Sequence, residues 1–140
     1  LLYYLWNNIT FFKKVKDTIN ILNKHIFKIL MDLKKITLNY FKEFSEKNIS
    51  SLEKYFAQDI VLKDWEIEKF GIDSVIKANK NIFNNVNNIN VEPLNLYKED
   101  NTVISELRIV INKSEILNVL ELIEFNEDKK IKRIFAYKRN

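Results

Sequence analysis

The residues of this chain that could do chemistry are carboxylates, tyrosines and lysines. The sequence contains one histidine, His25, and no cysteine. A histidine-based triad, a multi-histidine or thiolate metal site and a disulfide are therefore excluded within one chain. Any proton transfer must use the remaining ionisable side chains.

One carboxylate, Glu121, stands in an unusual place. In the segment ILNVLELIEFN (116–126), every second residue from Leu117 to Phe125 is apolar except Glu121. Alternate residues of a strand share one face, and a register shift of one residue would expose the apolar ones, so we expect Glu121 to point inward. Burial without a basic partner would raise its pKa and keep it protonated. The alternative is that Glu121 meets a lysine or lies at a solvated rim.

Hydrophobic periodicity predicts the elements that position this residue. Helices are predicted from about Leu33, from a Ser50–Glu53 capping box, and after Gly71, the only glycine. A brief strand over 60–62 comes between the second and third helices. Short polar turns separate four runs, at roughly 89–98, 102–112, 115–126 and 130–138, which predicts an antiparallel meander. The pattern indicates an α+β fold with helices on one face of a curved sheet.

Residues 1–30 form an N-terminal extension, and residues 31–140 form the main domain. Apolar residues between Phe12 and Ile29 follow a 3-4-3-4-3 spacing, which predicts an amphipathic helix. This helix could pack on the domain, pair with a second copy or lie on an acidic membrane surface. An equally simple account is that the domain starts at Met31 and the extension has little role. The opening LLYYLW is too short for a membrane span and lacks the positive residues of a signal peptide.

The net charge of +4 is carried by this extension. Residues 1–30 hold five of the 23 basic residues and one of the 19 acidic ones, which leaves 18 of each sign in 31–140. A neutral domain with interspersed charges argues against nucleic-acid binding. The lack of cysteine is compatible with a reducing compartment, and a cytoplasmic location is expected.

The region 31–138 resembles the nuclear transport factor 2-like (NTF2-like) superfamily, particularly its ketosteroid isomerase and SnoaL-like polyketide cyclase branch. The resemblance is carried by NYFKEFSEKNISSLEKYFAQDIVLKDW, FGIDSVIKANKNIF and ELIEFNEDKKIKRIFAY. It implies an NTF2-like cone, in which helices pack on a curved, mainly antiparallel sheet. The superfamily includes isomerases, cyclases, dehydratases, hydrolases and non-catalytic binding modules.

The isomerase pattern implies roles for three residues. It places the helix tyrosine on Tyr40, the general base on Asp64, and the second carboxylic acid on Glu121, which is one methylene longer than the aspartate of those enzymes. Asp64 would remove a proton next to a carbonyl, while Tyr40 and Glu121 would hydrogen-bond the enolate oxygen. Simpler roles exist as well, because Tyr40 lies on an apolar helix stripe and Asp64 follows a strand, where aspartate often serves a turn.

The expected ligand is a small apolar or carbonyl-containing compound, bound without a metal or organic cofactor. Candidates for an apolar lining are Phe44, Trp65, Phe83, Phe125 and Phe135, although each could instead belong to the core. A homodimer through the sheet is expected, because the outer face of strand 115–126 carries apolar residues, namely Ile116, Leu120 and Leu122. The competing function is a non-catalytic domain that binds a small ligand or a protein.

Overall fold

The computed structural model describes the backbone of residues 2–30 and 32–139, with the side chains of 9–26 and 32–139. The chain divides into two compact units, Leu1–Asp32 and Leu33–Asn140. The predicted seam at Met31 itself lies outside the described residues.

The first unit consists of one long helix, α1 (Leu2–Leu30), as the apolar spacing predicted. Its described apolar side chains are exposed, among them Phe12, Ile19 and Ile26. Among the described residues, no helix is long and apolar enough to cross a membrane. The role of α1 stays a prediction.

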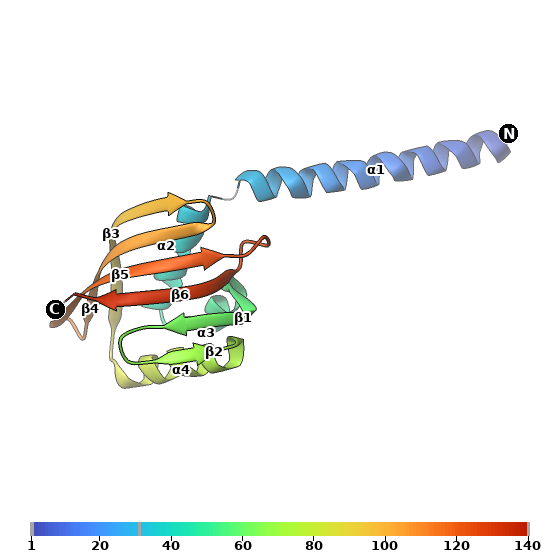
Figure 1. Ribbon diagram of the computed structural model, residues 1–140. Coiled ribbons are helices and arrows are strands. Elements are labelled where there is room, and N and C mark those ends of the chain that lie inside the picture. Colours follow the sequence, from blue (N-terminus) through green and yellow to red (C-terminus); the bar gives the residue numbers. More distant parts are fainter. Residues whose placement is uncertain (1, 31, 140) are drawn as a thin grey trace. The chain divides into compact units, whose positions relative to one another are not determined.

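The second unit is built on a six-stranded sheet with the order β2-β1-β6-β5-β4-β3 (Figure 1). All neighbouring strands are antiparallel except β1 and β6, which are parallel. The predicted meander of four strands is confirmed. The strands are β1 (Phe56–Lys63), β2 (Glu68–Phe70), β3 (Ile89–Glu99), β4 (Thr102–Ile111), β5 (Glu115–Phe125) and β6 (Ile131–Lys138).

The helices of this unit are α2 (Leu33–Ser45), α3 (Ile49–Leu52) with a 3-10 turn at Glu53–Tyr55, and α4 (Ile72–Asn85). Helix α2 packs against β3 and β4, whereas α4 packs against β1 and β2 (Figure 1). Gly71 precedes α4 with a φ of 79°, a conformation that side-chain-bearing residues rarely adopt. The predicted capping box is wrong: α3 begins at Ile49, so Ser50 lies within the helix, and the Asn48 side chain caps it by accepting the N–H of Ser51.

Strand alternation decides which side chains enter the core. On β4 the buried residues are Val103, Ser105 and Leu107. Their Cα partners on β5 are Ile123, Glu121 and Val119, in the same order. Glu121 therefore lies on the inner face of the sheet, in the orientation that the alternating pattern predicted.

Candidate functional site

The Leu33–Asn140 unit contains a cavity of about 300 Å³ between the helices and the inner face of the sheet. Its wall is mainly aliphatic, since most of the lining comes from the inward-facing residues of the strands. The apolar residues of the wall are Phe41, Phe44, Leu62, Trp65, Ile82, Ile89, Val91, Leu107, Ile109, Ile111, Leu117, Val119, Ile134 and Ala136. A volume of this size is enough for a small organic molecule.

The three residues singled out by the isomerase pattern line this one cavity. Tyr40 comes from α2, Asp64 directly follows β1, and Glu121 comes from the middle of β5. They lie within electrostatic reach of one another. The charge of Asp64 acts on the pKa of Glu121, and the charge of Glu121 acts on the pKa of Tyr40.

Glu121 is held in its neutral form by its surroundings. Burial, and secondarily the negative charge of Asp64, raise its pKa to about 8. Its Oε1 is inaccessible to solvent and has no hydrogen-bond partner in the described part of the chain. None of the ion pairs among the described residues involves Glu121. At neutral pH Glu121 is therefore mostly a carboxylic acid that can donate a hydrogen bond.

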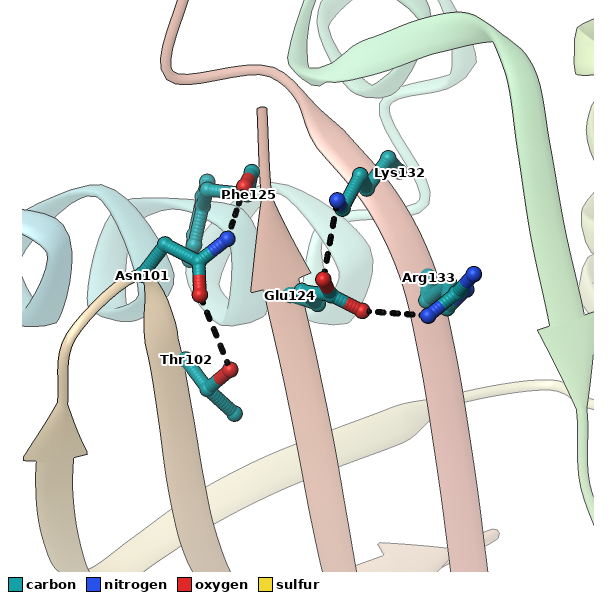
Figure 2. Close-up of polar contacts among 6 residues, drawn as sticks. All are labelled: Asn101, Thr102, Glu124, Phe125, Lys132 and Arg133. Atoms are coloured by element: carbon teal, nitrogen blue, oxygen red, sulfur yellow. Dashed lines mark hydrogen bonds and ion pairs between the residues drawn. The ribbon is translucent and has the colours of Figure 1, made fainter. Parts of the chain in front are cut away.

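Glu124, on the other face of β5, shows what cationic partners do to the same side chain (Figure 2). Its Oε1 lies 2.8 Å from Nζ of Lys132, and its Oε2 lies 2.9 Å from Nη1 of Arg133. The hydrogen bond from Lys132, together with both positive charges, lowers its pKa. The contrast assigns the raised pKa of Glu121 to its position on the inner face and not to the strand itself.

Two hydrogen bonds between Asn101 and Phe125, at the end of β5, fix the register that turns Glu121 inward and Glu124 outward. The amide Nδ2 of Asn101 donates to the carbonyl oxygen of Phe125 at 2.9 Å (Figure 2). The Phe125 N–H donates to the Asn101 carbonyl, also at 2.9 Å. Next to these hydrogen bonds, Thr102 is the Cα partner of Glu124. Sliding β5 by one residue would break both hydrogen bonds and turn Glu121 outward.

Asp64 combines a structural role with its place at the cavity. Its Oδ1 accepts hydrogen bonds from the backbone N–H groups of Glu66 and Ile67, at 2.7 and 2.8 Å. The N–H of Asp64 in turn donates to the carbonyl of Ile67 at 3.0 Å. These bonds form the turn between β1 and β2 and involve only one of the two carboxylate oxygens, so the turn and a chemical role are compatible.

Tyr40 likewise has both a packing role and a place in the cavity wall. Its ring lies 5.5 to 6.2 Å, centroid to centroid, from four other aromatic rings, those of Phe41, Phe44, Tyr55 and Phe56. Burial, and secondarily the charge of Glu121, raise the pKa of its hydroxyl well above the ordinary value. The phenol is therefore neutral and able to donate a hydrogen bond.

The five aromatic residues proposed for the lining divide into two groups. Phe44 and Trp65 line the cavity, whereas Phe83, Phe125 and Phe135 are absent from its wall. Phe83 packs behind Phe44 at 4.9 Å between ring centroids, and Phe125 is fully buried at the end of β5. Phe135 lies between the lining residues Ile134 and Ala136 on β6, so alternation directs it to the outer face.

Four polar lining residues were not identified from the sequence: Glu66, Asn79, Glu115 and Lys138. Glu66, Glu115 and Lys138 are exposed and give the opening of the cavity a mixed charge. Asn79 is buried on α4. The available signal was a polar residue on an otherwise apolar helix stripe, in the same way that Glu121 interrupts an apolar strand face.

Among the described residues, no group of three histidine, aspartate or glutamate side chains could hold a metal ion. The chemistry available to the side chains themselves is acid–base chemistry in an apolar space.

Comparison with known proteins relates the chain to others by structure alone. No family model and no curated protein matches the sequence. A candidate SnoaL-like polyketide cyclase from Shewanella denitrificans is 14% identical, with 76% of this chain and 90% of that chain covered and a TM-score of 0.68. A candidate ketosteroid isomerase from Kribbella flavida is 11% identical, with 77% and 78% covered and a TM-score of 0.68. An NTF2-like protein of unknown function from Cytophaga hutchinsonii is 11% identical, with 78% and 91% covered and a TM-score of 0.67.

The chain thus contains an α+β unit whose helices and curved sheet enclose an apolar cavity. Its architecture is the NTF2-like fold, which confirms the fold predicted from the sequence. Identities this low establish a shared fold and leave activity to be inferred from the site.

Proposed function

We propose that the cavity binds a small carbonyl compound and removes a proton from the carbon next to the carbonyl, in an isomerase, cyclase or lyase reaction. The observation that carries this proposal is the pairing of the Asp64 carboxylate with the neutral acid of Glu121 in one apolar cavity. Two carboxyl groups with different protonation states can serve as base and acid at the same pH.

In the proposed reaction, Asp64 accepts the proton through the carboxylate oxygen that the turn does not use. The electron pair of the broken C–H bond moves into the new C=C bond, and the carbonyl oxygen becomes an enolate oxygen. Tyr40 and Glu121 donate hydrogen bonds to this oxygen. Donors that are fixed in a water-poor site each contribute about 2.7–4 kcal/mol to lowering such a barrier.

The fate of the enolate distinguishes the three reaction types. An isomerase returns the proton from Asp64 to a different carbon. In a cyclase, the enolate carbon attacks a second carbonyl carbon of the same molecule, whose oxygen takes up a proton. A lyase expels a leaving group from the carbon next to the deprotonated one. None of these steps requires a metal or an organic cofactor.

A second candidate function is non-catalytic binding of the same class of compound. It is favoured by the hydrogen bonds of Asp64 to Glu66 and Ile67, because the turn alone explains an aspartate at this position.

Exchange of α-hydrogens for deuterium distinguishes catalysis from binding. The protein would be incubated in D₂O with a panel of cyclic ketones and hydroxyketones, and deuterium incorporation would be followed by NMR. We expect at least one ketone to exchange faster with the wild type than with Asp64→Asn, which keeps the turn acceptor and removes the base. If 2-naphthol, an enolate mimic, binds but every ketone exchanges equally with both proteins, the catalytic proposal is wrong and the binding function is favoured.

A further inference from the structure

The cavity contains a buried polar side chain that the proposed chemistry does not use. Asn79 lies on α4 and is 3% exposed. It shares the buried stripe of that helix with apolar neighbours such as Val75, Ile76 and Phe83. Together with Ile82, it forms the contribution of α4 to the cavity wall.

The amide of Asn79 lacks a partner where one is expected. Three buried side-chain atoms of the described residues have no hydrogen bond: Asn79 Nδ2, Ser105 Oγ and Glu121 Oε1. A buried amide donor without a partner destabilises the folded state, and leucine has a similar size without that penalty. An asparagine at this position is therefore explained by a hydrogen bond to something that occupies the cavity.

The donors already assigned to the carbonyl oxygen leave no place for Asn79. A carbonyl or enolate oxygen has two in-plane lone-pair directions, and Tyr40 and Glu121 supply one donor each. Asn79 comes from α4, whereas those two come from α2 and β5. Asn79, as a third donor on a different element of the wall, would therefore bind a second acceptor atom of the ligand. Asp64 places a negative charge in the wall of the same cavity, which disfavours a further anionic group, so this acceptor is a neutral oxygen.

We propose that Asn79 is a ligand-binding residue whose amide donates a hydrogen bond to a second, neutral oxygen of the ligand. The inference rests on the proposed function and narrows its substrate class. The substrate is a hydroxyketone or a diketone, not a ketone with a purely hydrocarbon remainder. Asn79 then selects among ketones, while Asp64, Tyr40 and Glu121 perform the chemistry.

The test compares ligands with one and two oxygens on three proteins. The probes are 2-naphthol and a set of dihydroxynaphthalene isomers, which are inert in the proposed reaction, and binding is followed by fluorescence titration. The proteins are the wild type, Asn79→Leu and Asn84→Leu. The last is a matched control, because Asn84 is exposed on the same helix.

We expect at least one dihydroxynaphthalene to bind the wild type and Asn84→Leu roughly threefold to tenfold more tightly than 2-naphthol, the gain from one hydrogen bond. Asn79→Leu should lose that preference and keep its affinity for 2-naphthol. Its thermal midpoint should equal or exceed that of the wild type, because an unpaired buried amide has been replaced by an apolar group of similar size.

Three results would overturn the inference. The first is that Asn79→Leu retains the preference of the wild type for a two-oxygen probe. The second is that no two-oxygen probe binds the wild type more tightly than 2-naphthol, including the case in which nothing binds. The third is a thermal midpoint of Asn79→Leu below that of the wild type, which would show that the amide has a structural partner. None of these results bears on deuterium exchange of ketones, so the failure of this inference and that of the proposed function are distinguishable.

Discussion

Glu121 and Glu124 lie three residues apart on β5 and face opposite sides of the sheet. Glu124 lies against Lys132 and Arg133, which lower its pKa, whereas Glu121 faces the apolar cavity, where burial raises its pKa to about 8. One strand thus carries a carboxylate outside and a carboxylic acid inside at the same pH.

The raised pKa of Glu121 predicts that stability falls with rising pH. Between pH 4.5, its ordinary pKa, and about pH 8, the folded state holds a proton that the unfolded state has lost. The stabilising contribution is complete below that range, declines through it and is lost above it. Between about pH 6 and about pH 8 the wild type should lose roughly 2 kcal/mol relative to Glu121→Gln, measured by urea unfolding.

Glu124→Gln is the matched control for this measurement. The lowered pKa of Glu124 in the wild type gives stability that is present above the ordinary glutamate pKa and lost as the pH falls. The free energies of unfolding of the wild type and Glu124→Gln should therefore change in parallel between pH 6 and 8. Parallel curves for the wild type and Glu121→Gln would contradict a neutral acid in the cavity.

Substitutions of Asp64 should separate its two roles. Asp64→Asn retains a side-chain oxygen for the N–H groups of Glu66 and Ile67, so its free energy of unfolding should change by less than about 1 kcal/mol. Asp64→Ala leaves both N–H groups without that acceptor and should cost about 1–2 kcal/mol. Both variants should lose the protein-dependent exchange of ketone α-hydrogens for deuterium. Equal stability of Asn and Ala variants in urea unfolding would show that the turn does not depend on this side chain.

The hydroxyl of Tyr40 should matter for binding and its ring for stability. Tyr40→Phe keeps the packing against Phe41, Phe44 and their neighbours, and should change stability by less than about 1 kcal/mol while weakening 2-naphthol binding roughly twofold to tenfold. Tyr40→Ala should cost about 3–5 kcal/mol by leaving a cavity. Fluorescence titration and urea unfolding provide the two readouts, and undiminished binding by the Phe variant would remove Tyr40 from the site.

Removal of residues 1–32 should leave the cavity-containing unit folded. The described hydrophobic core runs from Leu33 to Ile134, within the second compact unit. We expect the thermal midpoint of the 33–140 chain to lie within about 2 °C of that of the full chain. A midpoint more than about 5 °C lower would show that α1 contributes to the stability of this unit.

The outer face of the sheet is the surface on which we expect a second copy of the chain to dock. Leu120 and Tyr137 are Cα partners there and are 44% and 59% exposed. In a symmetric dimer Leu120→Glu would place two like charges in the interface, and should weaken dimerisation on the order of tenfold or more. Sedimentation analysis would compare it with Leu38→Glu, an exposed position on α2. A monomeric wild type, or equal effects of both substitutions, would contradict this interface.

The sequence predicted the fold wherever hydrophobic alternation was regular. The four strands of the meander follow it, and their bounds agree to within a few residues. Strand β1 begins at Phe56, earlier than the predicted 60–62. The prediction missed its first residues because Gln58 and Asp59 interrupt the apolar pattern, at an irregularity in the pairing of β1 with β6. Strand β2 has three residues, too few to show any alternation, and depends on its pairing with β1.

The site was predictable where one residue contradicts its surroundings. Glu121 breaks an apolar row, and its inward position follows from register alone. Asn79 breaks an apolar stripe in the same way, because it lies seven residues after Ile72 and three after Ile76 on the buried side of α4, so the test that singled out Glu121 would also have found it. Which inward-facing apolar side chains border empty space and which fill the core depends on the curvature of the sheet, so the sequence does not show that Phe125 belongs to the core. Phe135 is a different case, because its alternation with Ile134 and Ala136 already indicates the outer face.

The turn whose N–H groups bind one carboxylate oxygen of Asp64 has a consequence for the regioselectivity of the proposed reaction. A carboxylate clamped by two backbone N–H groups cannot swing to follow a substrate, so the substrate must bring the correct carbon to a fixed point in space. Under the proposed chemistry, the backbone conformation between Lys63 and Glu68 therefore determines which hydrogen of the substrate is removed. Inserting a residue into that segment would move the Asp64 carboxylate and so redirect which hydrogen is removed, without replacing any side chain of the cavity wall.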